Sequence, residues 1–409
     1  MNNYWKKVKL FELCKIKGGK RLPFGRSLSN KVTSHPYIRV RDLTNIRTLN
    51  ITSEFGYIDN ETYNQISRYI VNTDDVIISI VGTVGLISII GSTLNNANLT
   101  ENCAKLVNLK NIDNNFLYYY LVSSFGQDEI KKNSVGAVQQ KLPIYGIENI
   151  DIFLPPLEIQ KKIAKVLSAF DDKIELNNKI NENLEQQAQA IFKSWFIDFE
   201  PFGGTMPDDW KKYKLEDITS QIIRGFTSKY VEKSNLINLN QKVNKGKRLE
   251  KQYYKYLRED IPVPKEKYAQ KEDILLNSLG QGTLGRIHYW NEDSENIVVD
   301  QHITIIRKKD GVSTSEFLYL LLSSKPYEDY FEGCITGTTG MLMLNISTVR
   351  NTDLYLPNYD IQQKFSNIIK PMYKVIEKNI KENERLTQLR DTLLPKLMNG
   401  EIDVEKIKI

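Results

Sequence analysis

Two segments of this chain place apolar residues alternately four and three positions apart, which is the spacing of a heptad seam on one face of a long helix. The first seam runs from residue 163 to 195 and the second from 365 to 397, an offset of 202 residues. We expect each segment to be a long amphipathic helix. The seam positions are Ile163, Leu167, Phe170, Ile174, Asn177, Asn181, Leu184, Ala188, Ile191 and Trp195 in the first segment, and Phe365, Ile369, Met372, Ile376, Asn379, Asn383, Leu386, Arg390, Leu393 and Leu397 in the second.

Two asparagines interrupt each seam at matching positions. A polar seam residue lowers stability but fixes the register, because a mispaired helix would bury an amide without a partner. A lone helix with this apolar stripe would be unstable in water. The two seams most simply pack on each other, and docking on another protein is the alternative.

Pro371 lies inside the second seam, where a proline should break the helix or begin a new one. Asp171-Asp172 offers a helix cap at the matching place in the first seam. We therefore expect a short helix followed by a longer one in each half.

The sequence repeats beyond the seams. Asp151-Ile152-Phe153-Leu154-Pro155 returns as Asp353-Leu354-Tyr355-Leu356-Pro357, and Ile159-Gln160 returns as Ile361-Gln362. A period near 200 residues is too long for a solenoid unit, so it indicates a duplicated domain-plus-helix module. We expect an α+β fold with globular α/β domains at 1–156 and 201–358, and helical regions at 157–200 and 359–409.

Within the first globular part, shorter patterns predict individual elements. Residues 37–41 (Tyr-Ile-Arg-Val-Arg) alternate apolar and basic residues as a half-buried strand does, and residues 75–80 form an apolar strand before a glycine-rich turn. Residues 116–123 have helical spacing, and residues 150–154 form a last strand that Pro155-Pro156 ends. Together these elements predict an α/β unit.

Charge is unevenly distributed along the chain. The formal net charge is +6, yet residues 1–47 hold twelve Lys/Arg and two acids, and residues 242–271 hold ten Lys/Arg and four acids. One basic region in each half favours a polyanion partner over a merely solvated surface. No run of 18 apolar residues exists, so we expect no membrane span. Three scattered cysteines fit a reducing cytoplasm.

The residue patterns of catalysis are missing. The three histidines (His35, His288 and His302) have no metal-ligand spacing, and no Cys-x-x-Cys pair exists. Residues 280–285 match G-x-G-x-x-G, but a strand pattern follows at residues 286–290, where a phosphate-binding loop needs a helix. We expect no catalytic centre, no metal and no cofactor in this chain.

Several basic and amide side chains are candidates for DNA contact. Lys and Arg neutralise phosphates, and Gln pairs bidentately with adenine. Arg39 and Arg41 should project from one strand face, and the loop from Gly136 has a counterpart from Gly337. The candidates are Lys20, Arg21, Arg26, Arg39, Arg41, Gln139, Gln140, Lys141, Arg224, Lys229, Lys245, Lys247, Arg248, Gln281, Thr283, Thr338 and Thr339.

These motifs resemble the specificity subunits of type I restriction–modification systems. The resemblance lies in residues 154–164 (LPPLEIQKKIA), 190–201 (AIFKSWFIDFEP), 300–304 (DQHIT) and 393–402 (LLPKLMNGEI). It implies two target-recognition domains, each for half of a split double-stranded DNA site, and two helical regions that pack antiparallel and set the spacing.

The same resemblance implies protein partners. These are two modification subunits, which bind S-adenosylmethionine and methylate adenine, and restriction subunits that use ATP and Mg. The rival hypotheses are a stand-alone DNA-modifying enzyme and a helical interaction scaffold whose basic regions are incidental. Neither the target bases nor the spacer length follows from these motifs.

Overall fold

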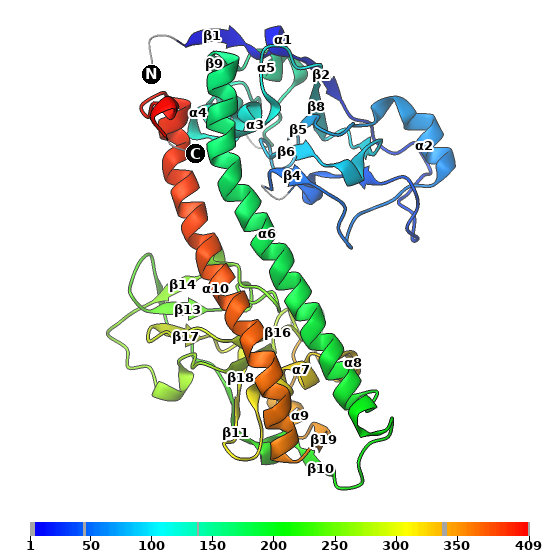
Figure 1. Cartoon of the computed structure of the whole chain (residues 1–409), viewed down its shortest axis with the longest axis vertical. Coiled ribbons are helices and arrows are strands. Elements are labelled where there is room, and N and C mark those ends of the chain that lie inside the picture. The colour runs from blue at the N-terminus through cyan, green and yellow to red at the C-terminus, as the bar shows by residue number, and fades with distance from the viewer. Residues whose placement is uncertain (1–4, 44–45, 137–138, 338–341, 408–409) are drawn as a thin grey trace. The chain divides into compact units, whose positions relative to one another are not determined.

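The computed structural model describes residues 5–43, 46–136, 139–337 and 342–407. The chain forms two compact units, here called unit 1 (Met1–Leu176 with Glu382–Ile409) and unit 2 (Asn177–Lys381). The unit boundaries fall inside two 40-residue helices, α6 (Leu157–Phe196) and α10 (Tyr359–Met398). Each unit therefore includes part of both helices (Figure 1).

The globular part of unit 1 is built on a five-stranded sheet of order β2-β8-β5-β6-β4, antiparallel except for the β4–β6 pair. One face packs against α3 and α6, and the other covers a second cluster around Ile38, Ile77 and Leu99. Its elements are β1 (Lys6–Lys9), α1 (Leu10–Leu13), β2 (Lys15–Gly18), β3 (Tyr37–Ile38), β4 (Thr48–Leu49), α2 (Asn60–Ile66), β5 (Val76–Ser79), β6 (Ile87–Ile90), β7 (Asn98–Leu99), β8 (Cys103–Val107), α3 (Asn114–Val122), α4 (Ser124–Lys132), α5 (Ile144–Glu148) and β9 (Asp151–Leu154).

Unit 2 repeats this plan with two four-stranded sheets, β11-β18-β15-β16 and β12-β14-β13-β17. The first sheet packs on α7 and the helix pair, and the second covers a core around Leu239, Trp290 and Val299. Its elements are β10 (Lys211–Lys214), β11 (Thr219–Arg224), β12 (Tyr230–Val231), β13 (Ile237–Leu239), β14 (Lys255–Leu257), β15 (Asp273–Asn277), β16 (Ile287–Trp290), β17 (Ile297–Val299), β18 (Ile303–Lys308), α7 (Ser315–Leu322), α8 (Lys325–Gly333), α9 (Ile346–Arg350) and β19 (Asp353–Leu356).

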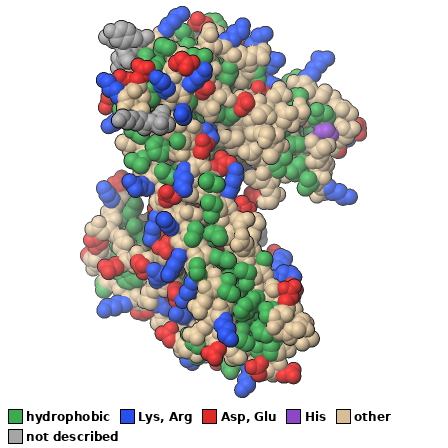
Figure 2. Space-filling view, in the orientation of Figure 1, with side chains coloured by type: hydrophobic (Ala, Val, Ile, Leu, Met, Phe, Trp, Pro, Cys, Tyr) green, Lys and Arg blue, Asp and Glu red, His purple; other side chains and the backbone are tan. Residues whose placement is uncertain are grey.

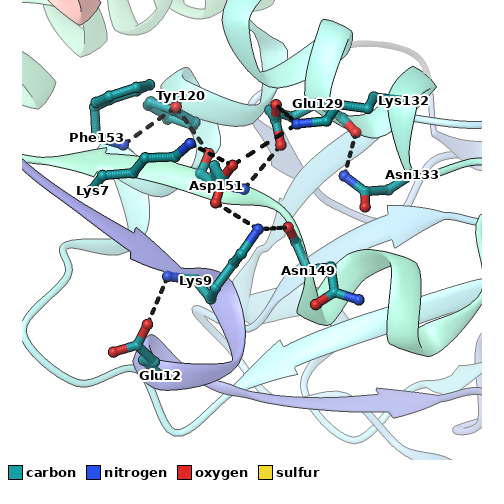
Figure 3. Close-up of polar contacts among 10 residues, drawn as sticks. All are labelled: Lys7, Lys9, Glu12, Tyr120, Glu129, Lys132, Asn133, Asn149, Asp151 and Phe153. Carbon is teal, nitrogen blue, oxygen red and sulfur yellow. Dashed lines mark hydrogen bonds and ion pairs between the residues drawn. The ribbon is translucent and has the colours of Figure 1, made fainter.

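The repeated Asp-x-x-Leu-Pro segments are the strands that enter the long helices. In each unit this strand pairs antiparallel with the first strand of that unit, β1 with β9 and β10 with β19. In unit 1 the buried Asp151 carboxylate forms ion pairs with Nζ of Lys7 at 2.9 Å and Nζ of Lys9 at 2.6 Å (Figure 3). Burial alone would raise the pKa of Asp151, but the two ammonium groups hold it below its usual value.

A buried glutamine joins each long helix to its globular part. Gln160 is 1% exposed; its amide N–H groups donate to the carbonyls of Asn111 and Pro155, and its oxygen accepts from the Asp113 N–H. Gln362, 0% exposed, makes the same three bonds in unit 2. It donates to the carbonyls of Val312 and Pro357 and accepts from the Thr314 N–H. The repeated Ile-Gln pair in the sequence therefore marks a repeated joint, here called the glutamine joint.

The expectation of a short helix before a longer one is wrong for both halves, because α6 and α10 are each unbroken. Pro371 lies on the exposed face of α10, and Asn367, whose carbonyl loses its helical donor, is also exposed. Water can therefore satisfy that carbonyl. Asp171 is no cap; it lies inside α6 and accepts from Arg390 and Tyr119.

The expected strand over residues 37–41 is also wrong beyond Ile38. The chain turns into a 3₁₀ helix at Val40–Asp42, because the Asp42 carboxylate accepts from the Arg39 N–H at 2.8 Å and from its guanidinium. Arg39 and Arg41 therefore share no strand face. The other expected elements, near residues 75–80, 116–123, 150–154 and 286–290, are confirmed.

The two long helices contact each other within each unit. In unit 1, Ile163 and Leu167 of α6 share a core with Leu397 of α10. In unit 2, Ala188 and Phe192 of α6 share a core with Phe365 and Ile369 of α10. Ten central seam positions differ in burial. Five are buried, namely Ile163, Leu167, Asn177, Ile376 and Asn379, and five are half-buried, namely Ile174, Asn181, Leu184, Asn383 and Leu386.

Candidate nucleic-acid interface

Four loops of unit 1 meet at one end of the five-stranded sheet. Strands β2 and β5 end where β8 and β6 begin, since Gly18 pairs with Ala104, Ser79 with Cys103 and Ile78 with Ile87. The segments 19–21, 81–86 and 100–102 therefore leave the sheet at the same end. The fourth loop follows α4 and includes Val135 and Lys141. It joins the other three through a β-bridge between Val81 and Lys141.

Unit 2 places the corresponding loops in the same way. Arg224 pairs with Thr304, Asn277 with Ile303 and Leu276 with Ile287, so β11 and β15 end where β18 and β16 begin. The bridge that joins the fourth loop is Leu279 with Met343. We call these two groups of loops the loop clusters.

A glycine lets the first loop of each cluster pass against the third. A Cβ built on Gly19 would lie 2.0 Å from the Thr100 carbonyl oxygen, and one on Gly225 would lie 2.1 Å from that of Val299. Any side chain would clash with backbone at these two positions.

A buried polar side chain at the end of the central strand holds the second loop of each cluster. The Ser79 hydroxyl donates to the Thr83 carbonyl at 2.6 Å. In unit 2 the Asn277 amide donates to the carbonyls of Thr283, Gln241 and Asn244. The formal G-x-G-x-x-G match at residues 280–285 is accordingly a strand-to-strand turn.

The basic candidates of unit 1 differ in how free they are to contact a ligand. Lys20 is exposed, Arg41 has a 69% exposed side chain, and Arg21 has an 80% exposed side chain with Glu101 as partner at 2.6 Å. Arg39 binds Asp42, and Arg26 binds carboxylates at the start of α2. The first three are therefore better placed for phosphate than the last two.

The fourth loop of unit 1 carries Gln139, Gln140 and Lys141, all of them exposed. Backbone bonds in both directions join Lys141 to Val135 at 2.8 Å. This pairing fixes the base of the loop and leaves the two amides in solvent.

The candidates of unit 2 divide in the same manner. Lys229, Lys247, Arg248 and Gln281 are exposed. Arg224 is half-buried and donates to the Leu344 carbonyl, and burial lowers its pKa. Lys245 ion-pairs with Glu250 at 3.3 Å, and the Thr283 hydroxyl bonds to carbonyls of its own turn. Thr338 and Thr339 lie outside the described residues.

Asp300 and His302 form a polar pair in the third loop of unit 2 that sequence reasoning missed. Nδ1 of His302 lies 2.5 Å from Oδ1 of the fully buried Asp300, and the His302 N–H donates to the same oxygen. Tyr230 donates to the other carboxylate oxygen at 3.2 Å. The motif at residues 300–304 (DQHIT) contributed to the family resemblance above, but the sequence alone did not indicate that Asp300 is buried and hydrogen-bonded to the His302 ring.

The face drawn in Figure 2 shows Lys and Arg side chains interspersed with Asp and Glu rather than gathered in one patch. In the part of the chain that the structure describes, no group of His, Cys, Asp or Glu is arranged to hold a metal ion. No helix within that part has the length and apolarity that crossing a membrane requires.

The geometry defines a duplicated α+β protein in which each globular part carries a loop cluster and is joined to a long helix. A family model described as "Type I restriction modification DNA specificity domain" matches residues 2–186 and again 207–388. The chain belongs to this family.

Individual relatives agree with the family match. The type I restriction enzyme MjaIX specificity subunit of Methanocaldococcus jannaschii is 26% identical over 424 residues, which cover 97% of this chain and 94% of the relative. The HindI specificity subunit of Haemophilus influenzae is 26% identical over 70% of this chain and 77% of its own length.

A solved structure shares the fold. The crystal structure of a type I restriction–modification system S subunit from M. genitalium matches with a TM-score of 0.56 and 17% identity, and the match covers 97% of each chain.

Proposed function

We propose that this chain is the DNA-specificity subunit of a type I restriction–modification complex and reads an asymmetric bipartite site. The recognition domains are residues 1–156 and 201–358, one for each half-site. The observation that carries the proposal is that the scaffold is repeated while the loop clusters differ. Three features occur in both units: the glutamine joint, the strand pair that leads into each long helix, and the glycine (Gly19 or Gly225) that packs against the third loop. The exposed side chains of the loops do not match between the units. Two similar readers with different contacts suit two different half-sites.

The helical regions, residues 157–200 and 359–409, act in this proposal as an antiparallel coiled coil that sets the distance between half-sites. The contacts in unit 1 join the first half of α6 to the second half of α10, and those in unit 2 join the remaining halves. The Asn379 amide donates to the Asn181 oxygen at 2.8 Å, which supports a role for the seam asparagines in register.

The partners in this proposal are double-stranded DNA, two modification subunits and restriction subunits, all in the cytoplasm. The modification subunits supply S-adenosylmethionine chemistry, and the restriction subunits use ATP and Mg. This chain contributes recognition and positioning and no catalytic group. The names and full-length coverage of the relatives support this assignment.

Domain exchange tests the proposal most directly. Replacing residues 205–355 with the matching segment of a relative should change one half of the methylated sequence and leave the other half unchanged. Inserting a few residues in α6 near Gln186 should change the spacer and keep both half-sites, because contacts belong to the loops and spacing to the helices. Methylome sequencing of cells with each variant, the parent chain or no copy of the gene measures both effects.

Two results would contradict the proposal. A domain exchange that altered both half-sites would mean that the domains do not read independently. Methylation by rigorously partner-free protein with added S-adenosylmethionine would favour the stand-alone enzyme.

A further inference from the structure

One loop of unit 1 combines strong exposure of apolar groups with positive charge. Phe24 and Val32 are 107% and 80% exposed, the highest values among the large hydrophobic side chains of the described residues. Lys20, Arg21 and Lys31 are exposed in the same stretch between β2 and β3. Single exposed hydrophobic residues are ordinary on a protein surface. Two in one basic loop next to a loop cluster indicate a contact with an anionic partner that also offers apolar surface.

The loop is held firmly on both sides of Phe24. Leu22 and Leu28 pack against the small core formed by α2 and β3. The Ser29 N–H donates to the Tyr57 carbonyl at 2.7 Å, and Arg26 ion-pairs with carboxylates at the start of α2. Phe24 is therefore exposed on a loop that is fixed by contacts on both sides.

A tight turn carries the ring at its tip. The Arg26 N–H donates to the Pro23 carbonyl at 3.0 Å, so Phe24 and Gly25 are the two central residues. Gly25 has a φ of +77°, which the third position of a type II turn requires and which glycine adopts without strain. The turn chemistry thus fixes Phe24 as a single projecting aromatic side chain.

Unit 2 lacks this feature. Aligned on Gly19 and Gly225, the counterpart of Phe24 is Tyr230, which is 49% exposed and lies in β12. Its hydroxyl donates to Asp300. Because the Tyr230 side chain is hydrogen-bonded within its own domain, it is less free than Phe24 to contact a ligand.

We propose that Phe24 wedges between neighbouring base pairs of the half-site that unit 1 reads, while Lys20, Arg21 and Lys31 contact the adjoining phosphates. The proposal rests on the proposed function and adds a specificity determinant to it. An apolar side chain inserted at a base step unstacks and kinks the duplex, and the energy needed depends on the sequence of that step. A ring already ordered on a braced turn loses little conformational entropy on insertion.

The test uses the full chain assembled with its modification subunit and duplexes that carry 2-aminopurine at successive positions of both half-sites. Apart from the target adenines, which the modification subunits extrude, the parent complex should raise the fluorescence at one step, in the half-site that changes when residues 1–156 are exchanged. Phe24→Ala should abolish that rise and weaken binding on the order of tenfold. Phe24→Leu should keep the rise, because leucine is also a wedge.

The matched control is Phe11→Ala, which removes a ring that is 56% exposed in α1, outside the loop cluster. It should leave fluorescence and affinity unchanged, and all three variants should keep the parent melting temperature because both rings are exposed. If the parent complex binds its methylated sequence without a fluorescence rise at any step other than the target adenines, the wedge is wrong and the proposed function stands. If the parent complex does not prefer that sequence over a scrambled duplex, the proposed function fails and the wedge fails with it.

Discussion

Units 1 and 2 share the glutamine joint but differ in the polar groups between their helices. In unit 1, Asp171 of α6 accepts from Arg390 of α10 and from the Tyr119 hydroxyl, each at 2.5 Å. In unit 2, the buried Glu185 of α6 accepts from the Tyr373 hydroxyl of α10 at 3.4 Å. The joint is therefore common to both halves, whereas the helices contact each other through an ion pair in unit 1 and, in unit 2, through packing of aromatic rings of α6 against Phe365 of α10.

The difference shows in the charge balance of the two carboxylates. Burial would lower the pKa of Arg390, but Asp171 and Asp391 raise it well above its ordinary value. Burial raises the pKa of Glu185, and Lys247 and Tyr373 offset only part of that effect. Unit 1 has a compensated buried charge, and unit 2 has an undercompensated one.

The largest expected effect is equal in both units. Gln160→Ala and Gln362→Ala should each lower the free energy of unfolding of their unit by about 3 kcal/mol, because each leaves one buried donor and two acceptors without partners. Hydrogen exchange read separately in α3 and α7 would measure the loss unit by unit. Lys161→Ala and Gln363→Ala, at exposed neighbouring positions, are the controls. If only one of the two substitutions lowered the free energy of unfolding, the two joints would have the same geometry but would not contribute equally to stability.

The ion pair should matter in unit 1 only. Arg390→Met should lower the stability of unit 1 by about 2 kcal/mol, because it removes the cation that pairs with the mostly buried Asp171 carboxylate. Arg385→Met, at an exposed position of α10, is the matched control. Adding Asp171→Asn to Arg390→Met should recover part of the loss in urea denaturation. Additive effects of the two substitutions would show that the pair is not coupled.

Within unit 1, substitutions of exposed basic side chains and of the half-buried Arg39 should have different effects on DNA affinity and on stability. Changing Lys20, Arg21 and Arg41 together to Ala should reduce the slope of log K against log salt by up to about 3, since each phosphate contact contributes roughly 0.9. Arg39→Ala should instead destabilise the domain and keep the slope, because Arg39 binds Asp42 and the Glu54 carbonyl. Binding of the assembled complex to target DNA at several salt concentrations measures the slope. An unchanged slope for the triple variant would place these side chains away from DNA.

The smallest expected effect has the opposite sign and belongs to unit 2. Glu185→Gln should stabilise unit 2 by about 1 kcal/mol at neutral pH, since it removes an undercompensated buried charge. Because the folded state raises the pKa of Glu185 above 4.5, it binds the proton more tightly than the unfolded chain. Unit 2 therefore loses stability as pH rises from that value through the folded pKa. Thermal melts between pH 4.5 and 7 should show a weaker decline for Glu185→Gln than for the parent or for the exposed control Glu182→Gln.

The repeat, the long helices and the strand next to each helix could be predicted from sequence because each is a periodic or duplicated local pattern. The break at Pro371 could not be predicted correctly, because a proline's cost depends on whether water reaches the freed carbonyl of Asn367. The strand at residues 37–41 failed because one side chain, Asp42, redirects the backbone. Among the candidate DNA contacts, composition identified Arg39 and Arg21 equally, and only the fold shows that Arg39 is half-buried whereas Arg21 is exposed.

The glutamine joint has a consequence for how such a chain can change over generations. Apart from the two glutamines, every group in the joint is a main-chain amide or carbonyl, at residues 111, 113 and 155 in one unit and 312, 314 and 357 in the other. A main-chain carbonyl is present whatever side chain a position carries, and a main-chain N–H is lost only with proline. Mutations can therefore accumulate in the globular part, including its loop cluster, without requiring a matching change in the helix. A joint made by one glutamine side chain and main-chain partners can thus be kept while the side chains of the globular part change.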